Sequence, residues 1–445
     1  MTLSETPNLR GTDRPVIVVG GGPVGMTAAA RLAAAGTPVV LVEANAVPLT
    51  DWRASTFHAA TLELLDGIEI TSRMHAEGLV VPLYHFRDRR DGLIAEFDFR
   101  LLSDETPYPY RLQLNQQHLV RFLYERLRED DGVELLFGSR VVDTATTADG
   151  VAAVVETPDG TRTITGTHLI GADGPRSTVR RTQGIGFPGF TYPERFLIVS
   201  TTVELRDLIP DLAHVNYIAD PVQWLFVLRT PESWRVVLPV SPDEPIEKAT
   251  APERLQETLQ GVAPNPDGYP IVDHQAYNVH QRVASTFRSG NIVIAGDAAH
   301  INSPIGGVGL NSGIHDVMDA TERILRIRAG DADPDAELDA YDTVRRRIAI
   351  EYVQADTQRN TERLKETDES ARRATHEEMR ATAADPERAR AYMRRVSLLE
   401  SVRRFGIGRP PEAIEELEPA RRQNQEWNET HTESRNESRN QEART

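Results

Sequence analysis

The hydrophobic pattern of residues 15–43 predicts a complete βαβ unit. Val16–Val19 is a short β-branched run of the kind that forms a buried parallel strand. An alanine-rich helix is expected over Met26–Ala35, with Gly36 as its C-cap. A second strand is expected over Pro38–Val42. The period therefore changes from strand to helix and back to strand within thirty residues, which is typical of a nucleotide-binding domain.

Beyond this unit the pattern separates two kinds of structure. Further helices are expected over Arg53–Leu65, Asn115–Glu129, Leu310–Arg328 and Asp335–Thr361. From Phe187 to Val283, alternating strand-like stretches and Pro- or Asp-rich turns favour a mostly antiparallel sheet. Aromatic and charged residues also alternate over 80–102, with a turn at 90–92. The end of the chain is helix-prone and highly charged, and residues 423–445 carry almost no apolar side chain.

The turn after the first strand carries the chemistry of the βαβ unit. Gly20–Gly25 satisfies the spacing G-x-G-x-x-G, and Glu43 follows the second strand. In such a turn Gly20 permits the tight bend, Gly22 lets the backbone approach a pyrophosphate, and Gly25 lets helix and strand pack closely. Glu43 can accept a hydrogen bond from a ribose hydroxyl. A glycine-rich turn in an ordinary α/β protein is the alternative.

Composition excludes several classes of protein. The net charge of −17 argues against general affinity for nucleic acid or anionic membranes, so an anionic ligand would need local arginines. The absence of cysteine excludes disulfides, thiolate catalysis and cysteine-ligated metals. No signal-peptide pattern is evident, and no apolar run approaches the roughly 18 residues of a membrane span. We therefore expect a cytoplasmic protein without a nucleic-acid or membrane partner.

Two further glycine-bearing segments accompany the first. One is Gly171–Arg180, which contains Asp173, Gly174 and Arg176; the other is 296–311, which reads GDAAH and then PIGGVGLN. With these three motifs, in this order and spacing, the sequence resembles the single-component flavoprotein aromatic hydroxylases, the group typified by para-hydroxybenzoate hydroxylase. The resemblance covers residues 15–347.

The resemblance implies an α/β fold. A Rossmann-like FAD-binding domain, with a parallel sheet and a small antiparallel sheet, would be interleaved with a mostly antiparallel substrate-binding domain. We assign 15–79, 103–185 and 286–365 to the FAD-binding domain, and 80–102 and 186–285 to the substrate-binding domain. C-terminal helices would occupy 366–422, and 1–14 and 423–445 are expected to be disordered.

The resemblance also assigns cofactor contacts. The first loop would hold the ADP half of FAD, and Arg53 and Gln116 match an arginine and a glutamine that contact the cofactor, with Gln117 as a substitute. Asp297 would bind the ribitol, and the loop from Pro304 would wrap the isoalloxazine. The full set is Gly20, Gly22, Pro23, Val24, Gly25, Glu43, Ala44, Arg53, Gln116, Asp173, Gly174, Arg176, Asp297, Pro304, Gly307, Gly309, Leu310 and Asn311.

Some of these residues have other interpretations. Asp173, which the family uses for both FAD and NAD(P)H, could instead join Arg176 and Arg180 in a local ion-pair network. Asp297 could simply cap the turn that follows it. The chain also departs from the family at Val308, where Gln is frequent, and at Asp319-Ala320, where an Asn-Leu pair is frequent. These departures leave the local geometry open.

The implied reaction has two halves. NADH or NADPH, as a transient co-substrate, would reduce FAD, and O2 would then form a flavin C4a-hydroperoxide that hydroxylates a small phenolic or N-heteroaromatic substrate. The substrate reacts best as a phenolate, so a base or proton relay is expected. Candidates for contact with the reacting groups are His214, Tyr217, Gln223, Trp224 and Arg235 from the second lobe, and Pro304 from the flavin loop.

No metal site is expected. His300 has no partner at ligand spacing, and both it and His280 are taken as structural. Other reactions on the same fold remain alternatives: an epoxidase, a prenyl-chain reductase, a halogenase or a flavin-binding protein without turnover. The Trp-x-Trp-x-Ile-Pro stretch and the active-site lysine of halogenases are missing. A homodimer is left open.

Overall fold

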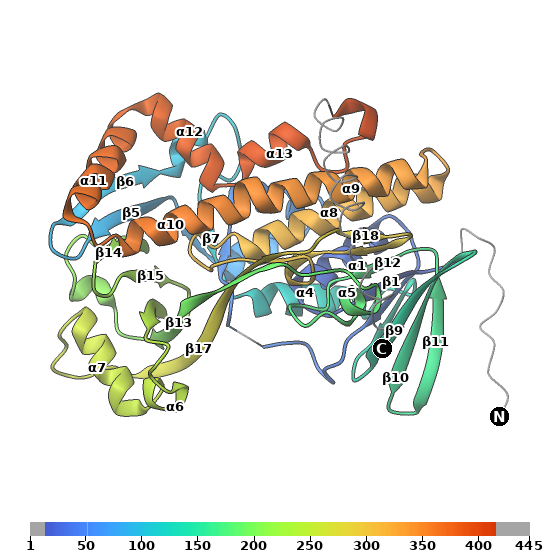
Figure 1. The fold of residues 1–445 in the computed structure, drawn as a ribbon, viewed down its shortest axis with the longest axis horizontal. Helices are drawn as coiled ribbons and strands as arrows, with labels where there is room; N and C mark the ends of the chain where they lie inside the picture. The colour runs from blue at the N-terminus through green and yellow to red at the C-terminus, as the bar shows by residue number, and fades with distance from the viewer. Residues whose placement is uncertain (1–13, 51, 415–445) are drawn as a thin grey trace, which may run out of the picture.

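The protein has two lobes, and the first is built on a six-stranded sheet in the order β18-β19-β12-β1-β2-β8. The computed structural model describes residues 14–50 and 52–414 (Figure 1). β1, β2, β8, β12 and β19 run parallel, and β18 pairs antiparallel with β19. The strands are β1 (Val16–Val19), β2 (Val39–Val42), β8 (Val133–Leu136), β12 (Leu169–Gly171), β18 (Arg288–Ser289) and β19 (Ile292–Ile294). Every residue of β1, β2, β12 and β19 is buried, which explains their continuous apolar runs.

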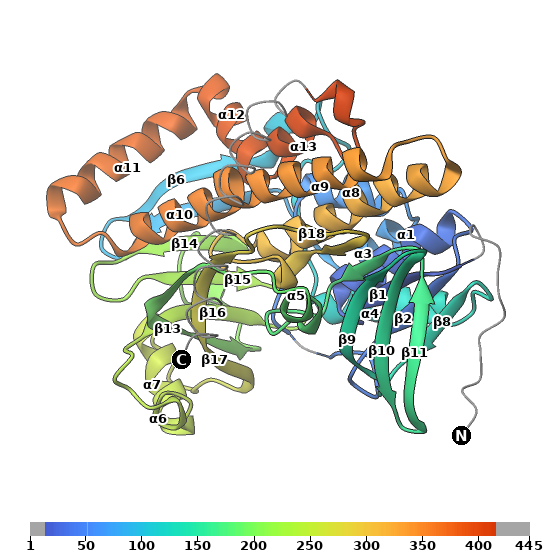
Figure 2. The same cartoon turned by 45° about the vertical axis from the view of Figure 1, so that its right-hand side comes forward.

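Helices and a small sheet complete this lobe. α1 contacts both α4 and α8. Figure 2 shows the three-stranded sheet β11-β10-β9 in front of the parallel sheet, and buried side chains of both belong to one core. The elements are α1 (Pro23–Ala34), α2 (Ala59–Asp66), α3 (Thr71–Glu77), α4 (Gln116–Leu127), α5 (Thr178–Thr182), α8 (Gly309–Ala329), β9 (Arg140–Thr147), β10 (Gly150–Thr157) and β11 (Gly160–Gly166).

The helix expected over Arg53–Leu65 is wrong at its start. Residues Thr56–Phe57 form β3, which pairs with β7 (Arg111–Gln113) in a three-stranded sheet completed by β4 (Leu79–Val81). Only α2, from Ala59 onward, is helical. The pairing partner lies more than fifty residues away, so no local periodicity could indicate it.

The second lobe is built on an eight-stranded sheet in the order β20-β17-β13-β16-β15-β14-β5-β6. Its strands come from both ranges assigned above to the substrate-binding domain, and β20 comes from the flavin-loop region. They are β5 (Leu83–Asp88), β6 (Gly92–Asp98), β13 (Gly189–Thr201), β14 (Val215–Ala219), β15 (Leu225–Arg229), β16 (Trp234–Val240), β17 (Ile271–Val283) and β20 (His300–Ile301).

The two faces of this sheet have different partners. On the outer face Leu197, Val227 and Trp234 pack in a core with α6 (Ile246–Ala249) and α7 (Pro252–Val262). On the inner face Ile198 and Phe226 join a core that reaches the first lobe and the C-terminal helices. The alternation along each strand therefore decides which side chains can meet a ligand between the lobes.

A long helical segment crosses both lobes (Figure 1). It consists of α9 (Pro334–Ile348), a π-helical turn over Ala349–Gln354 and α10 (Ala355–Lys365). α11 (Glu369–Ala384) and α12 (Pro386–Val396) then pack on β6, and α13 (Leu399–Phe405) contacts α2. No helix within 14–50 or 52–414 is long and apolar enough to cross a bilayer. Apart from Arg14, the disorder expected over 1–14 and 423–445 falls outside the described residues.

Candidate active site

A cavity of about 790 Å³ lies between the first lobe and the inner face of the eight-stranded sheet. All three glycine-bearing segments contribute to its wall. The predicted cofactor residues that line it are Gly20, Gly22, Pro23, Val24, Glu43, Ala44, Arg53, Gln116, Asp173, Gly174, Arg176, Asp297, Pro304, Gly307, Gly309 and Leu310. Gly25 and Asn311 lie behind this wall, and Gln117 does not line it. Segments far apart in the sequence thus converge on one elongated space.

The first glycine loop is as tight as its spacing predicts. Gly20 has a φ of +109°, and a Cβ there would lie 2.3 Å from the carbonyl oxygen of Ala172. A Cβ on Gly25 would lie 1.9 Å from the carbonyl oxygen of Gly20. A Cβ on Gly22 would meet nothing within 4 Å, so its backbone borders open space. The loop therefore packs closely behind and leaves room for a ligand at the N-terminus of α1.

Glu43 is held in place by the same loop. Its Oε2 accepts from the backbone N–H of Gly21 at 2.6 Å, and its Oε1 accepts from the backbone N–H of Asn45 at 2.7 Å. Oε1 also accepts from Nδ2 of Asn45 at 2.6 Å, whereas Oε2 keeps a second lone pair, so the fixed carboxylate can still accept from a ribose hydroxyl at the cavity wall through Oε2.

Asp173 caps a helix rather than joining an ion-pair network. Its Oδ2 accepts from the backbone N–H groups of Thr178 and Val179 at 2.6 and 3.1 Å. Burial raises the pKa of Asp173, and its Oδ1 is buried without a hydrogen-bond partner. Arg180 donates to backbone carbonyls, those of Ala298 and Pro175. Arg176 is exposed at the cavity wall. The unused Oδ1 leaves an acceptor for a ligand group.

Asp297 and the N-terminus of α8 both line the cavity, and they are twelve residues apart in the sequence. Asp297 is exposed to the cavity, and the surrounding protein raises the pKa of its carboxyl group. α8 begins at Gly309, so its free backbone N–H groups lie where the cavity is lined by Gly309 and Leu310. These groups favour negative charge on a bound ring at this point.

Asn311 fixes the loop that precedes α8. It is fully buried, and its Nδ2 donates to the carbonyl oxygens of Thr56 and Gly307 at 2.8 and 2.6 Å. Its Oδ1 accepts from the backbone N–H of His58 at 2.9 Å. Asn311 therefore positions the flavin loop on β3 rather than lining the cavity.

Asp319 stands at one of the two places where the sequence departs from the family pattern. It forms an ion pair with Arg323 and accepts from the backbone N–H of Gly408, which ties the C-terminal segment to α8.

These residues fit FAD. The open glycine backbone at Gly22, the arginine at 53 and the N-terminus of α1 suit a pyrophosphate. The unpartnered Oδ1 of Asp173 and the carboxylate of Asp297 are acceptors for hydroxyl groups. The bare loop from Pro304 to Gly309 suits a flat ring.

The part of the cavity next to the second lobe has a different character. Its wall consists of the inner-face side chains Ile198, Phe226, Leu228 and Val237, with Val279 and Tyr277 from β17. One charged side chain, Arg235, stands among them. Burial raises the pKa of Tyr277 well above its usual range, which keeps this phenol neutral. An apolar wall with few polar groups is typical of a site for a small aromatic molecule.

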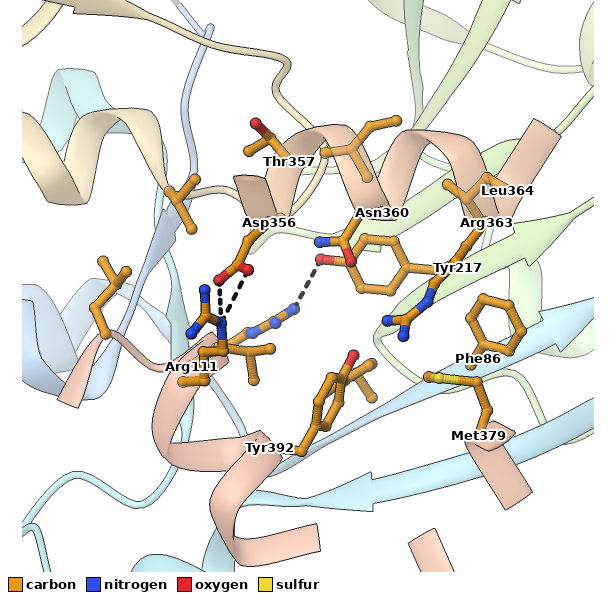
Figure 3. A pocket seen from close by; sticks show the side chains of 17 residues that line it. Phe86, Arg111, Tyr217, Asp356, Thr357, Asn360, Arg363, Leu364, Met379 and Tyr392 are labelled. Atoms are coloured by element: carbon orange, nitrogen blue, oxygen red, sulfur yellow. Dashed lines mark hydrogen bonds and ion pairs between the residues drawn. The ribbon is translucent and has the colours of Figure 1, made fainter. Parts of the chain in front are cut away.

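A second, smaller cavity of about 30 Å³ lies on the other side of the flavin loop. Ile305, Gly306 and Val308 line it, whereas Pro304, Gly307 and Gly309 line the large cavity. Figure 3 shows Tyr217, Tyr392, Asn360 and Arg363 around this space, with Arg111 reaching the Tyr217 hydroxyl. Nη1 of Arg111 donates to Tyr217 Oη at 3.2 Å, and the guanidinium lies over the rings of Tyr84, Phe99 and Tyr217.

Of the six candidates for contact with the reacting groups, His214, Gln223 and Trp224 line neither cavity, so the structure does not bring them to the site. His214 is half-buried beside Trp234, on the side of the sheet that faces away from the flavin loop, and burial lowers its pKa. Trp224 packs edge-on against Phe196 in the core. Each directly precedes a strand, β14 or β15, whose register decides which face the side chain reaches, and alternation alone did not fix that register. Tyr217 and Pro304 do line cavities.

The structure also shows where Gln223, His280 and His300 lie. Gln223 does not line either cavity. His280 lines the large cavity and its Nδ1 is 2.9 Å from the hydroxyl of Thr191. His300 bonds through Nε2 to Asp316, which also pairs with Arg345. Both histidines thus have partners within the fold, in keeping with a structural role.

Sequence reasoning missed the polar lining of the small cavity. Arg111 comes from β7, and Asn360, Arg363 and Tyr392 come from α10 and α12. No sequence signal singled out Arg111, because it opens a three-residue strand that reads Arg-Leu-Gln and is not an apolar run. The C-terminal helices gave no signal, because their charged residues are typical of a solvated surface.

Comparisons with known proteins agree with this geometry. Residues 13–356 match a family model described as an FAD binding domain. The chain is 34% identical to para-nitrophenol 4-monooxygenase of a Pseudomonas species over 361 residues, 80% of this chain and 89% of that protein. It is 32% identical to 6-hydroxy-3-succinoylpyridine 3-monooxygenase HspB of Pseudomonas putida, over 76% of this chain and 86% of that protein.

A solved structure is similar over nearly the whole chain. The crystal structure of p-nitrophenol 4-monooxygenase PnpA from Pseudomonas putida superposes with a TM-score of 0.83 at 29% identity. The alignment covers 89% of this chain and 99% of that chain. Both lobes and the interface between them are therefore shared.

Proposed function

Because the chain belongs to the FAD-dependent aromatic monooxygenases of the para-hydroxybenzoate hydroxylase-like group, we propose that it hydroxylates a small phenol at the junction of its two cavities. NADH or NADPH would be the electron donor. The observation that carries this proposal is the placement of the flavin loop. One side borders the large cavity, and the other borders the Arg111–Tyr217 pair.

Bound FAD would supply the redox chemistry that passes two electrons from the nicotinamide to O2, so that one oxygen atom would enter the ring and the other would leave as water. This chain's residues would hold it along the large cavity. Gly22 and Arg53 would face the pyrophosphate, Glu43 the ribose and Asp297 the ribitol. The N-terminus of α8 would stabilise negative charge on the flavin ring.

The aromatic substrate would lie against the inner face of the eight-stranded sheet. Tyr217 stacks on Phe226 with ring centroids 4.7 Å apart, and Phe226 lines the large cavity. A substrate ring on this wall can therefore direct its hydroxyl toward Tyr217. Arg111 would favour the negative oxygen of the phenolate, because its positive charge is buried beside Tyr217. The apolar wall would exclude water during oxygen transfer.

The activities for which the relatives are named indicate which compounds to examine first. Relatives act on para-nitrophenol, 6-hydroxy-3-succinoylpyridine and pentachlorophenol. We infer that this chain takes a substituted phenol or hydroxypyridine of similar size. A homodimer stays a prediction, which light scattering on the purified protein would check.

The test measures coupling between reductant and product. The purified protein should retain FAD, and a substrate should accelerate NADH or NADPH oxidation at least tenfold. Hydroxylated product should form in a one-to-one ratio with the nicotinamide consumed. A protein that binds FAD yet oxidises neither nicotinamide faster with any phenol or hydroxypyridine would contradict the proposal.

A further inference from the structure

The turn between β15 and β16 brings a glutamate of the second lobe onto the first lobe. Glu232 lies in this turn, between the last residue of β15 and the first residue of β16. Its Oε2 accepts from Nδ2 of Asn115 at 2.8 Å, and its Oε1 accepts from Nε2 of His118 at 2.8 Å. Asn115 directly precedes α4, and His118 lies in the first turn of that helix. We call Glu232, Asn115 and His118 the interlobe clamp.

The ring of His118 is also held from its other side. Its Nδ1 lies 2.7 Å from Oε2 of Glu77 at the end of α3, and the same oxygen accepts from Nη2 of Arg121 at 2.6 Å. Contacts at both ring nitrogens fix the orientation of the imidazole. Asn115 is fully buried, and the side chains of His118 and Glu232 are 19% and 27% exposed. Solvent and salt therefore screen the clamp less than an open surface pair.

Asn115 leaves its ordinary role to make this contact. Asparagine is a favoured N-cap because its side-chain oxygen accepts from a backbone N–H in the first turn of the helix. Asn115 stands at the N-cap of α4, yet its side chain makes no such bond. Its Nδ2 donates to Glu232 instead, and its Oδ1 is buried without a hydrogen-bond partner. Local rules of this kind are typically broken at functional or strained sites.

The clamp joins the two walls of the large cavity. Gln116, the first residue of α4, lines the cavity on the first-lobe side, where the sequence predicts a flavin contact. Phe226 and Leu228 of β15 and Val237 of β16 line it on the opposite side, where the substrate ring is proposed to lie. The carboxylate of Glu232 is therefore a direct link between the substrate wall and the flavin wall.

Internal hydrogen bonds make the turn a stiff link. The backbone N–H and the hydroxyl of Thr230 both donate to the carbonyl oxygen of Ser233, at 2.8 and 3.2 Å, and both residues are fully buried. β15 and β16 pair with each other from Phe226 to Arg229. Phe226 in turn stacks on Tyr217. A displacement of the turn would therefore move the wall on which the substrate ring is proposed to lie.

We propose that the interlobe clamp is a positioning device, in which Glu232 sets the distance between the substrate wall and the flavin held by the first lobe. This role rests on the function proposed above. Oxygen transfer needs the ring carbon in contact with the activated oxygen, and a misplacement of about 1 Å can lower such a step by about 10²-fold. Electron transfer from the nicotinamide does not use this wall.

Loosening the clamp should therefore separate the two halves of the reaction. Oxygen that is not transferred to the ring takes both electrons of the nicotinamide and two protons, and it leaves as hydrogen peroxide. The quantity to measure is the coupling, which is the amount of hydroxylated product formed per nicotinamide oxidised. Coupling is a ratio, so it does not depend on how much of a variant folds or retains FAD.

Glu232→Ala removes both hydrogen bonds of the clamp. The FAD-loaded protein is assayed with para-nitrophenol, 4-hydroxybenzoate and 2-hydroxypyridine, and the compound with the highest wild-type coupling is used. We expect the coupling of Glu232→Ala to fall by about threefold or more, with hydrogen peroxide making up the difference. The rate of nicotinamide oxidation should stay within about threefold of the wild-type rate, because the wall does not take part in that step.

A pair of variants tests the contact between Asn115 and Glu232 directly. Asn115→Asp places two carboxylates against each other, so coupling should fall as it does in Glu232→Ala. Adding Glu232→Gln exchanges the donor and the acceptor of this bond, and the side-chain oxygen at position 232 can still accept from His118. The double variant should recover about half or more of the wild-type coupling.

Amide hydrogen exchange supplies a readout besides turnover. In the FAD-loaded protein without substrate, the amides of residues 229–234 should exchange about tenfold faster in Glu232→Ala and in Asn115→Asp than in the wild type, because the turn loses its contact with α4. The double variant should return toward the wild-type rate.

Asp243→Ala is the matched control. Asp243 is an exposed acid that follows the other end of β16, and the strand is 7 residues long, so this residue lies about 20 Å from the clamp. Its coupling and its exchange over 229–234 should match those of the wild type.

Three results would overturn the proposal. The first is wild-type coupling in Glu232→Ala. The second is a variant that unfolds at lower temperature or loses FAD while its loaded fraction couples like the wild type, because the clamp would then be a structural contact only. The third is a double variant that couples no better than Asn115→Asp. Failure of the proposed function looks different, because then the wild type itself forms no hydroxylated product from any of the three compounds, and the positioning role falls with it.

Discussion

Arg111 donates a hydrogen bond to the hydroxyl of Tyr217 across 106 positions of sequence, at 3.2 Å. Both side chains are buried, and within 14–50 and 52–414 no carboxylate forms an ion pair with Arg111. The positive charge is therefore available to favour negative charge on an oxygen bound beside Tyr217. This relationship makes Tyr217 the most direct test of the reaction chemistry.

Replacing Tyr217 with Phe should lower kcat by about 10²-fold to 10⁴-fold, the range for loss of a positioned proton-transfer group. Aromatic packing on Phe226 would be kept, so FAD content and substrate binding should change little. The residual activity should rise with pH as the free phenol ionises. Measurements of kcat from pH 6 to pH 10 check this.

The controls for Tyr217 are the two residues that the structure removes from the site. His214→Asn and Trp224→Phe should leave kcat within about threefold, since neither residue lines a cavity. If His214→Asn has the larger effect on kcat, or if Tyr217→Phe is fully active, the assignment of the substrate hydroxyl to Tyr217 is wrong.

Two neighbouring glycines should respond differently to alanine. In Gly25→Ala the new Cβ would lie 1.9 Å from the carbonyl oxygen of Gly20, so the loop must move and the protein should lose FAD and unfold at lower temperature. In Gly22→Ala the Cβ meets no protein atom within 4 Å, so the apoprotein should be as stable as the wild type.

FAD affinity shows whether the backbone of Gly22 lies against the bound pyrophosphate. The alanine methyl group would occupy space at the cavity wall, so FAD should bind at least tenfold more weakly although the fold is intact. Thermal unfolding of the apoproteins and titration with FAD check both variants. Equal FAD affinity in Gly22→Ala and the wild type would place the pyrophosphate elsewhere.

Acid should destabilise the protein through two buried histidines, His58 beside the flavin loop and His315 in α8. Burial lowers the pKa of His58 to about 3, with Arg111 contributing, and burial lowers the pKa of His315 to about 3, with Arg345 contributing. His58 contacts the carbonyl oxygen of Gly306 through Nε2. Both groups are neutral in the folded state at all moderate pH values.

The sign follows from proton uptake. Below the ordinary histidine pKa of about 6.5 the unfolded chain binds protons that the folded chain refuses, so the stability present above pH 6.5 is lost as pH falls toward 3. Each histidine should reduce the free energy of unfolding by about 2 kcal/mol between pH 8 and pH 5. His315→Gln should remove its share of this pH dependence, as urea unfolding at several pH values would show. His274→Gln, on an exposed position of β17, should not change the slope.

The first lobe was predictable because its signals are local. The strand, glycine turn, helix and second strand of the βαβ unit follow one another directly in the sequence, and the structure has them within a few residues of the expected bounds. The helices from Gln116 and Gly309 were predicted by their apolar spacing. In contrast, β3 was missed because its partner, β7, lies far along the chain.

The sequence by itself determined the fold class, the FAD-binding motifs and the family, because glycine spacing and hydrophobic period are properties of short segments. Only the tertiary structure decided which side chains share a wall. Sheet register turned Tyr217 and Arg235 inward and left His214 on the side away from the flavin loop, and docking of α10 and α12 closed the small cavity around Arg111. A one-residue change of register reverses the face of every side chain on a strand, and helix docking depends on contacts far apart in the sequence, so neither can be inferred from local pattern alone.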